Sequence, residues 1–328
     1  MYVMKKRPRR IRKNQFIRDL VAETSLPQVS QLIYPVFIQD GRNFFQEIKS
    51  MPGQYRMSVD TLLQKMANWK KLGINNFALF PNIDNKFKNA KSTEALNKNG
   101  FLYEAIKQIK DRFPETNLFT DLALDPFNSD GHDGIVENGE IMNDKTVEVL
   151  ARMAVLQAQS GADFVCPSDM MDGRVGMIRK ALENEGLSNT GIVAYSAKYA
   201  SSFYGPFRDA LDSAPRAGDK KTYQMDYRNA REAIKEIDLD IKEGADIVMI
   251  KPALSYLDII AQAKRYFKHP VAAYNVSGEY AMVKAAGQNG WIDENKAMVE
   301  ILTSIKRAGA DIIFTYHAID YAKLRTSL

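Results

Sequence analysis

Eight short apolar runs, separated by helix-like segments, constrain the fold of this sequence more than any other feature. Each run is too continuously apolar to keep one face in water, which is typical of strands buried on both faces of a parallel sheet. The eight predicted strands span residues 32–38, 76–80, 117–124, 163–167, 191–196, 246–252, 271–276 and 311–316.

Amphipathic segments with apolar residues at helical spacing lie between most of these runs, for example at 61–73, 146–161 and 295–310. The motifs "SGAD", "EGAD" and "AGAD" mark helix ends, because glycine readily takes the left-handed conformation there. Alternating strands and helices predict an α/β fold, a (β/α)8 TIM barrel, and 328 residues suit a barrel with an arm and enlarged loops. The sequence has no G-x-G-x-x-G or G-x-x-x-x-G-K-[ST] motif, which disfavours a dinucleotide enzyme or a P-loop ATPase.

The basic excess of the chain lies in its first residues. Seven of the 45 Lys and Arg residues fall in residues 1–14, so the remaining 38 face 40 Asp and Glu residues. The body is therefore not a basic surface, and no nucleic-acid or membrane partner is expected for it. We predict an N-terminal arm for subunit contacts, residues 1–31, followed by one catalytic barrel, residues 32–328. RNA or an acidic lipid surface is the alternative contact for such an arm.

A cytoplasmic location is the expectation for this chain. No apolar run approaches the length of a membrane span, and the charged start is not followed by the apolar stretch of a signal peptide. The single cysteine, Cys166, excludes an intramolecular disulfide and a thiolate metal cluster within one chain. We interpret it as a buried structural residue.

Two lysines stand at the ends of neighbouring predicted strands. Lys198 follows "IVAYSA" and Lys251 follows "DIVMI". The carboxyl ends of barrel strands surround the active site, so both side chains should enter one mouth. An apolar wall and a second cation both lower the pKa of an amine and make it nucleophilic. The pair predicts carbonyl chemistry through Schiff bases, whereas either lysine alone would more simply be a solvated strand end or a phosphate contact.

Aromatic residues and a long loop follow Lys198. The loop 205–224 has the composition of a mobile lid, and its cations suit a carboxylate-bearing substrate, with solvated loop charges as the alternative. We expect the aromatic residues to surround Lys198 and to keep water from an imine. The cations are Arg208, Lys220 and Lys221, and the aromatic residues are Tyr195, Tyr199, Phe203, Tyr204 and Phe207.

Five segments carry a resemblance that covers essentially the whole chain: "LALDPFNSDGHDG", "PSDMMDGRVG", "AYSAKYASSFYGPFRDA", "VMIKPALSYLDII" and "YNVSGEYAM". Together they resemble the porphobilinogen synthase family, also called δ-aminolevulinate dehydratases. The resemblance implies a (β/α)8 barrel whose N-terminal arm clasps a neighbouring subunit, commonly in a homo-octamer. It also implies a hydro-lyase that condenses two molecules of 5-aminolevulinate to porphobilinogen with loss of two waters, early in tetrapyrrole and haem synthesis.

The resemblance assigns roles to individual residues. It implies that Lys251 binds the ketone of the substrate that becomes the propionate side, and that Lys198 binds the acetate-side substrate. The residues implied to bind substrate are Ser277 and Tyr316 for the propionate-side carboxylate, Arg208, Lys220 and Gln224 for the other carboxylate, and Asp121 and Ser168 in the acetate-side subsite.

The segment "DLALDPFNSDGHDG" departs from zinc-dependent members, which have three cysteines where this chain has Ala123, Asp125 and Asp133. A catalytic zinc of that kind is not expected, because alanine has no ligand atom and carboxylates prefer harder ions. The resemblance is to the aspartate-rich, zinc-independent branch, in which Mg²⁺ acts allosterically at a subunit interface and Glu236 matches its ligand. No organic cofactor is implied. Asp125 and Asp133 are open as an ion site, a water site or proton-transfer groups.

The roles of the three histidines are still open, and so are two functions other than the one that the resemblance implies. For His132 we favour a loop role over a ligand or a general acid; His317 could line the mouth, and His269 resembles a turn residue. A Schiff-base aldolase would need only one imine lysine. A barrel without catalytic activity that binds nucleic acid or partners through the arm is the third hypothesis, disfavoured by the full set of site residues.

Overall fold

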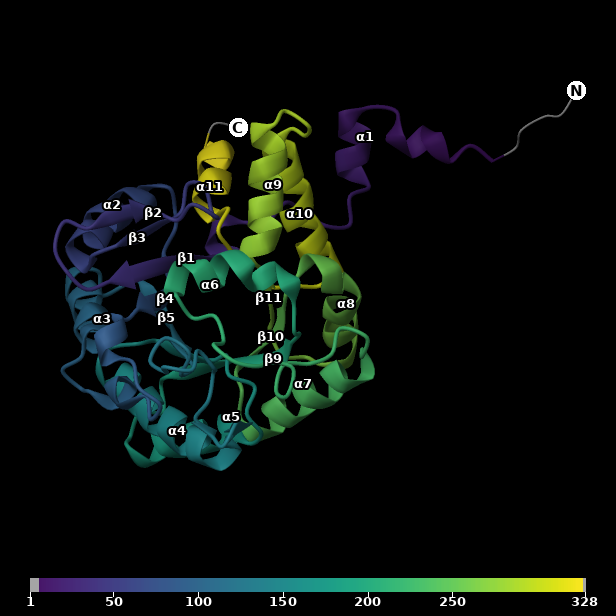
Figure 1. Cartoon of the computed structure of the whole chain (residues 1–328). Coiled ribbons are helices and arrows are strands. Elements are labelled where there is room, and N and C mark those ends of the chain that lie inside the picture. The colour runs from purple at the N-terminus through teal and green to yellow at the C-terminus, as the bar shows by residue number, and fades with distance from the viewer. Residues whose placement is uncertain (1–5, 327–328) are drawn as a thin grey trace, which may run out of the picture.

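The computed structural model describes residues 6–326, and at its centre eight parallel strands close into a barrel (Figure 1). Closure comes from pairing of the last strand with the first, where Leu32 is the register partner of Ile313. Both ends of each strand lie within two residues of the predicted ends. The predicted (β/α)8 barrel is therefore confirmed. The barrel strands are β1 (Leu32–Gln39), β4 (Asn76–Asn82), β5 (Asn117–Leu122), β8 (Phe164–Pro167), β9 (Gly191–Lys198), β10 (Ile247–Lys251), β11 (Val271–Asn275) and β12 (Ile312–Thr315).

Helices surround the barrel on its outer side (Figure 1). The three helices predicted at 61–73, 146–161 and 295–310 are present, each shifted by one to three residues at its ends. The α-helices after the arm are α2 (Val59–Lys71), α3 (Phe101–Arg112), α4 (Asn143–Gln159), α5 (Arg174–Asn184), α6 (Gly205–Leu211), α7 (Arg231–Glu243), α8 (Leu257–Tyr266), α9 (Ser277–Gln288), α10 (Glu294–Ala308) and α11 (Ala318–Thr326).

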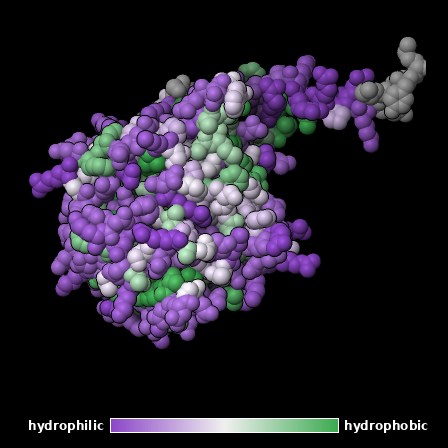
Figure 2. All heavy atoms as spheres, viewed as in Figure 1, coloured by the Kyte–Doolittle hydropathy of each residue, from purple (hydrophilic) through white to green (hydrophobic). Residues whose placement is uncertain are grey.

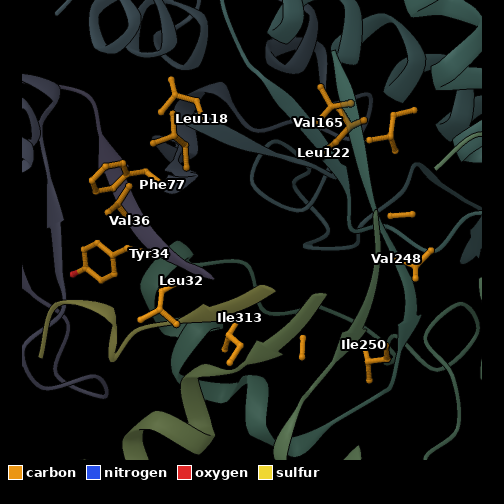
Figure 3. Packing of buried hydrophobic residues seen from close by; sticks show 14 of the residues in the cluster. Leu32, Tyr34, Val36, Phe77, Leu118, Leu122, Val165, Val248, Ile250 and Ile313 are labelled. Atoms are coloured by element: carbon orange, nitrogen blue, oxygen red, sulfur yellow. The ribbon is translucent and has the colours of Figure 1, made fainter. Parts of the chain in front are cut away.

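Alternate residues of the strands face two separate apolar cores, since successive strand side chains point to opposite faces. On β1, Leu32, Tyr34 and Val36 belong to the large cluster between strands and helices, part of which Figure 3 shows. Phe37 of the same strand belongs to the second cluster, which fills the barrel interior. Cys166 on β8 lies in this inner cluster and is buried, which agrees with a structural role.

Several short elements were not predicted. Two hairpins of two or three residues per strand lie outside the barrel proper, and 3₁₀ turns connect larger elements. The hairpins are β2 (Phe45–Glu47) with β3 (Tyr55–Met57) and β6 (Val136–Glu137) with β7 (Glu140–Ile141), and the turns are η1 (Pro8–Arg12), η2 (Val29–Gln31), η3 (Asn85–Phe87), η4 (Thr93–Leu96), η5 (Ser202–Tyr204) and η6 (Leu254–Tyr256).

The chain before the barrel runs away from it as an extended arm that carries helix α1 (Gln15–Leu20) (Figure 1). Apolar side chains on this arm are open to solvent, and Phe16 and Leu20 are each 83% exposed. Figure 2 shows green, hydrophobic atoms on an arm that is otherwise mostly hydrophilic. The first five residues of the predicted arm lie outside the described part of the chain. Within residues 6–326 no helix has the length and apolarity needed to cross a membrane.

Candidate active site

The two lysines are the last residues of adjacent strands β9 and β10 and are register partners of one another. A backbone hydrogen bond of 2.9 Å, from the N–H of Tyr199 to the carbonyl of Lys251, ties the two strand ends together. Both lysine side chains are buried. The strand pattern thus correctly placed two ammonium groups at one mouth of the barrel.

Lys251 lies among aromatic rings. Its Nζ is 4.4 Å from the ring centroid of Tyr274, 4.9 Å from Tyr195, 5.1 Å from Phe207 and 5.4 Å from Tyr204. Burial, reinforced by the neighbouring charge of Lys198, lowers the pKa of Lys251 to about 7. A substantial fraction of this amine is therefore neutral, and nucleophilic, near neutral pH.

Lys198 has a polar environment instead. Its Nζ donates a 3.0 Å hydrogen bond to Oδ2 of Asp133 and a second one to the backbone carbonyl of Ser168. The other oxygen of Asp133 accepts from Nζ of Lys220 at 2.5 Å, and Lys220 also lies 3.6 Å from Asp125. Burial alone would raise the pKa of Asp133, but Lys198 and Lys220 together hold it below its usual range. The ionised carboxylate thus bridges two ammonium groups.

Asp121, near the end of β5, is a carboxyl group whose pKa is shifted in the direction opposite to that of Asp133. Burial, with a contribution from nearby Asp125, raises the pKa of Asp121 to about 7. Asp121 can therefore exchange a proton near neutral pH, while Asp133 stays ionised. Two carboxyl groups with separated pKa values are a common arrangement for proton transfer in an active site.

A cavity of about 30 Å³ joins these groups, which is room for about one water molecule. Oε1 of Gln224 is buried and has no hydrogen-bond partner within the described chain. An unpaired buried acceptor of this kind marks a place where a polar ligand would bind. The residues that line the cavity are Asp121, Asp125, Asp133, Ser168, Lys198, Tyr204, Phe207, Arg208, Lys220, Gln224 and Lys251.

Two predicted substrate binders, Ser277 and Tyr316, lie outside this lining. The hydroxyl of Ser277 accepts from the N–H of Phe207 at 3.0 Å and donates to the carbonyl of Phe203 at 3.3 Å. The hydroxyl of Tyr316 lies 3.1 Å from that of Tyr274. Both residues therefore contact residues whose rings surround Lys251, and are separated from its Nζ by those rings.

The expectation that aromatic residues surround Lys198 is wrong, since Tyr195, Tyr204 and Phe207 face Lys251. Tyr199 turns away and stacks on Tyr256, with ring centroids 4.2 Å apart. Proximity in the chain misled the prediction because η5 and α6 fold back over the barrel mouth, where the hydroxyl of Tyr204 donates to the carbonyl of Lys251 and Phe207 packs on Phe80 of β4. Tyr274 was missed altogether, although alternation along the strand at 271–276 could have placed it facing inward.

The three histidines lie in three different environments. Both ring nitrogens of His132 contact protein atoms at 3.0 Å, the hydroxyl of Tyr223 and the carbonyl of Ala217, which supports the favoured loop role. His317 is buried against Tyr280 rather than lining the small cavity, and burial lowers its pKa to about 3. His269 lies half-buried in the connection between α8 and β11.

The donor set at the lysine site does not fit a catalytic zinc. Ala123 has no ligand atom, and the oxygens of Asp133 already accept from two ammonium groups. Throughout residues 6–326 no three His, Cys, Asp or Glu side chains are grouped as a metal site. Glu236 lies apart from the lysines, on α7, beside a surface cleft of about 910 Å³. Its pKa is raised by burial, which Arg174 opposes and Asp240 and Asp172 reinforce.

Comparison with known proteins agrees with the geometry. A model of the family described as "Delta-aminolevulinic acid dehydratase" matches residues 5–324. The protein of that name from Bradyrhizobium diazoefficiens is 50% identical over 322 residues, covering 98% of this chain and 91% of the relative. The chloroplastic relative from Glycine max is 52% identical and covers 97% and 77%.

A solved structure is similar over nearly the whole chain as well. It is the delta-aminolevulinic acid dehydratase (porphobilinogen synthase) of Toxoplasma gondii ME49 in complex with the reaction product porphobilinogen. The two chains are 51% identical and superpose with a TM-score of 0.95, covering 98% of this chain and 92% of the other. The chain described here belongs to the delta-aminolevulinic acid dehydratase family.

Proposed function

We propose that this chain is a porphobilinogen synthase, which condenses two molecules of 5-aminolevulinate to porphobilinogen with loss of two waters. Family membership supports the reaction, as does the product bound to the solved relative. The observation that carries the proposal is the register pair of Lys198 and Lys251, two amines at one mouth with different surroundings. A reaction that joins two ketones through two imines needs such a pair.

Lys251 is the first nucleophile in this mechanism. Its neutral amine adds to the ketone of one substrate molecule, and the carbinolamine loses water to give an imine. The aromatic rings around its Nζ keep further water away and so protect the imine from hydrolysis.

Lys198 binds the ketone of the second molecule as an imine, whose electron withdrawal acidifies the neighbouring carbon. Loss of a proton there gives an enamine that attacks the first molecule. Asp121, with its pKa of about 7, is suited to accept or deliver that proton, and Asp133 holds Lys198 in position. The new carbon–carbon bond leaves Lys251 attached to the first molecule, and Lys251 is released by elimination with loss of a proton. The amine of the first molecule then attacks the imine carbon on Lys198, which closes the ring and displaces Lys198. Holding both molecules in register removes much of the entropy cost of their encounter.

The substrate carboxylates determine how the molecules are oriented. Arg208, Lys220 and Gln224 line the cavity from the lid side and would bind the acetate-side carboxylate once Lys220 exchanges Asp133 for substrate. Ser277 and Tyr316 would bind the other carboxylate after Phe207 moves aside. Because the cavity has room for only about one water molecule, the lid has to move before substrate can enter.

Trapping the imine tests this proposal directly. Borohydride added with 5-aminolevulinate should attach substrate mass to the peptide that contains Lys251 first, and porphobilinogen should form in the untreated reaction. Unmodified peptides at both lysines, in folded protein, would refute the imine mechanism. Activity that survives Lys198→Ala and is lost in Lys251→Ala would indicate a one-lysine aldolase instead.

The family uses metal ions, and we propose that the ion here is an allosteric Mg²⁺ near Glu236. A half-buried carboxylate beside a wide surface cleft suits Mg²⁺, which keeps several waters and takes few protein ligands. Glu236 alone is an incomplete site, so a neighbouring subunit would complete it. No step of the condensation passes through this ion.

We also propose a homo-octamer built through the arm, residues 1–31, with residues 32–328 as the catalytic domain. The exposed apolar residues of α1 support a contact with another copy, because such side chains gain by burial. For location, the cytoplasm is the proposal, and the chloroplast named for some relatives is its rival. Fractionation of the cells that make the protein would decide between them.

A further inference from the structure

Two segments from different parts of the chain dock on each other above the lysine site. We call residues 125–134 the aspartate loop and residues 212–225 the lid loop. The backbone N–H of Arg216 donates a 3.0 Å hydrogen bond to the carbonyl of Asp130. Gly131 packs so closely on Ala214 that a Cβ atom would collide with its carbonyl. The two loops therefore form a fitted contact rather than a chance approach.

His132 and Tyr223 complete this contact with side-chain hydrogen bonds. Nε2 of His132 lies 3.0 Å from the carbonyl of Ala217, which can only accept, so this nitrogen carries the proton. In the neutral ring Nδ1 then accepts from the hydroxyl of Tyr223 at 3.0 Å. The oxygen of that hydroxyl accepts in turn from the N–H of Asp133 at 3.3 Å. In this series of hydrogen bonds, both ring nitrogens of His132 and the hydroxyl of Tyr223 have a partner.

Tyr223 lies close in sequence to the two lid-loop residues that line the lysine cavity. It follows Lys220 by three residues and directly precedes Gln224, the two lid-loop residues that line the lysine cavity. Tyr223 and His132 themselves lie outside that lining. Burial, with Asp133 nearby, raises the pKa of Tyr223, so its hydroxyl keeps the proton that it donates.

We propose that His132 and Tyr223 are positioning residues that latch the lid loop to the aspartate loop and thereby hold Lys220 and Gln224 over the lysine pair. The latch itself follows from the hydrogen bonds above. Its kinetic consequence rests on the proposed function, because Lys220 and Gln224 bind substrate only if that function is correct.

Removing one hydroxyl should weaken the latch measurably. In Tyr223→Phe the ring is kept, while Nδ1 of His132 and the N–H of Asp133 both lose their partner. The loss of such a bond shifts the balance between closed and open lid about tenfold. Substrate must then close the lid itself, so its apparent affinity falls with the closed fraction. We expect KM for 5-aminolevulinate to rise several-fold while kcat at saturation changes little.

Hydrogen exchange on the full chain without substrate tests the latch independently of activity. Peptides covering residues 212–225 should exchange about tenfold faster in Tyr223→Phe than in the wild type. Tyr227→Phe is the matched control, because that side chain is 67% exposed, and it should leave exchange unchanged. Peptides from β9 and β10 should be protected equally in all three proteins.

A second variant tests whether the two residues act as one unit. In a His132→Phe background, adding Tyr223→Phe should accelerate lid exchange less than it does in the wild type, because the bond between the two side chains is already absent and only the contact with the N–H of Asp133 is still lost. Full additivity of the two substitutions would overturn the latch, as would unchanged lid exchange in Tyr223→Phe or an acceleration spread over the whole barrel.

The outcomes separate this inference from the proposed function. Wild-type protein that makes no porphobilinogen would reject the function, while the exchange data would still decide the latch. Wild-type protein that makes porphobilinogen, combined with faster lid exchange and an unchanged KM, would reject the positioning role alone.

Discussion

Lys220 donates to Asp133 through a 2.5 Å hydrogen bond, so a lysine expected to bind substrate is paired with a carboxylate of the site itself. The same carboxylate accepts from Lys198 at 3.0 Å. All three side chains are buried, so each charge depends on the others for its stabilisation. Substrate carboxylate and Asp133 would therefore compete for Lys220, which couples binding to the freedom of Lys198.

Replacing the shared carboxylate should destabilise the folded protein. In Asp133→Asn two buried ammonium groups lose their anion, and removal of one partner from a buried ion pair costs about 3 kcal/mol or more. Urea unfolding measures this loss. Asp219→Asn is the matched control, because its pair with Lys221 is exposed and screened by solvent, so its loss should change the stability little.

The stabilisation that Asp133 gives to the folded protein should also depend on pH, and it should fall as the solution becomes more acidic. Its folded-state pKa is below the ordinary value, so the stabilisation is present above about pH 4 and is lost as the pH falls through the lowered pKa. The stability difference between wild type and Asp133→Asn should shrink in acid. A difference that stays constant from neutral pH into strong acid would contradict the ion-pair account.

We expect buried Lys251 to destabilise the folded protein, a cost that its proposed catalytic role would explain. Its pKa falls from 10.5 to about 7 on folding, so the unfolded chain binds more protons between these values and stability rises with pH there. Lys251→Met should stabilise the protein by up to about 4 kcal/mol below pH 7 and by much less above pH 10.

Urea unfolding at pH 6, 8 and 10 checks this prediction. Lys264→Met serves as a control, because Lys264 is a partly exposed lysine paired with Asp311 and should show no such gain. Equal stability of Lys251→Met and wild type at pH 6 would mean that Lys251 is charged and well solvated in the folded state, against the proposed neutral nucleophile.

The sequence was sufficient to predict the barrel because its eight strands are continuous apolar runs, which are visible locally. Lys198 and Lys251 could be placed for the same reason, since a strand end is a local feature. The two hairpins were missed because strands of two or three residues carry no period. Each hairpin is an antiparallel pair of such short strands.

The surroundings of the lysines could not be predicted from local pattern. Asp133 and Lys220 are 87 residues apart, and their contact exists only because the aspartate loop and the lid loop meet above the barrel. Tyr274 reaches Lys251 from the next strand, β11. The sequence therefore indicated where Lys198 and Lys251 lie, whereas the contact of Tyr274 and the pairing of charges required the folded chain.

Magnesium should affect the rate through Glu236 and not through the lysine site. Metal-stripped wild type should gain porphobilinogen-forming activity with Mg²⁺ and be indifferent to Zn²⁺. Glu236→Gln should lose that stimulation, because an amide oxygen binds Mg²⁺ more weakly than a carboxylate. Glu148→Gln, an exposed position on α4, should respond like wild type. A requirement for Zn²⁺ would overturn the reading of Ala123, Asp125 and Asp133.

The arm should govern assembly through its apolar residues rather than its charge. Phe16 and Leu20 are each 83% exposed on a helix of six residues, too short to be stable alone in water. Changing both to Glu should shift the protein from the large oligomer to smaller species with the barrel still folded, measured by light scattering and circular dichroism. The apolar double change Phe16→Leu with Leu20→Met should keep the oligomer. An intact octamer in the Glu variant would exclude α1 as the contact, and RNA binding lost on deletion of residues 1–14 would favour the charged-arm alternative.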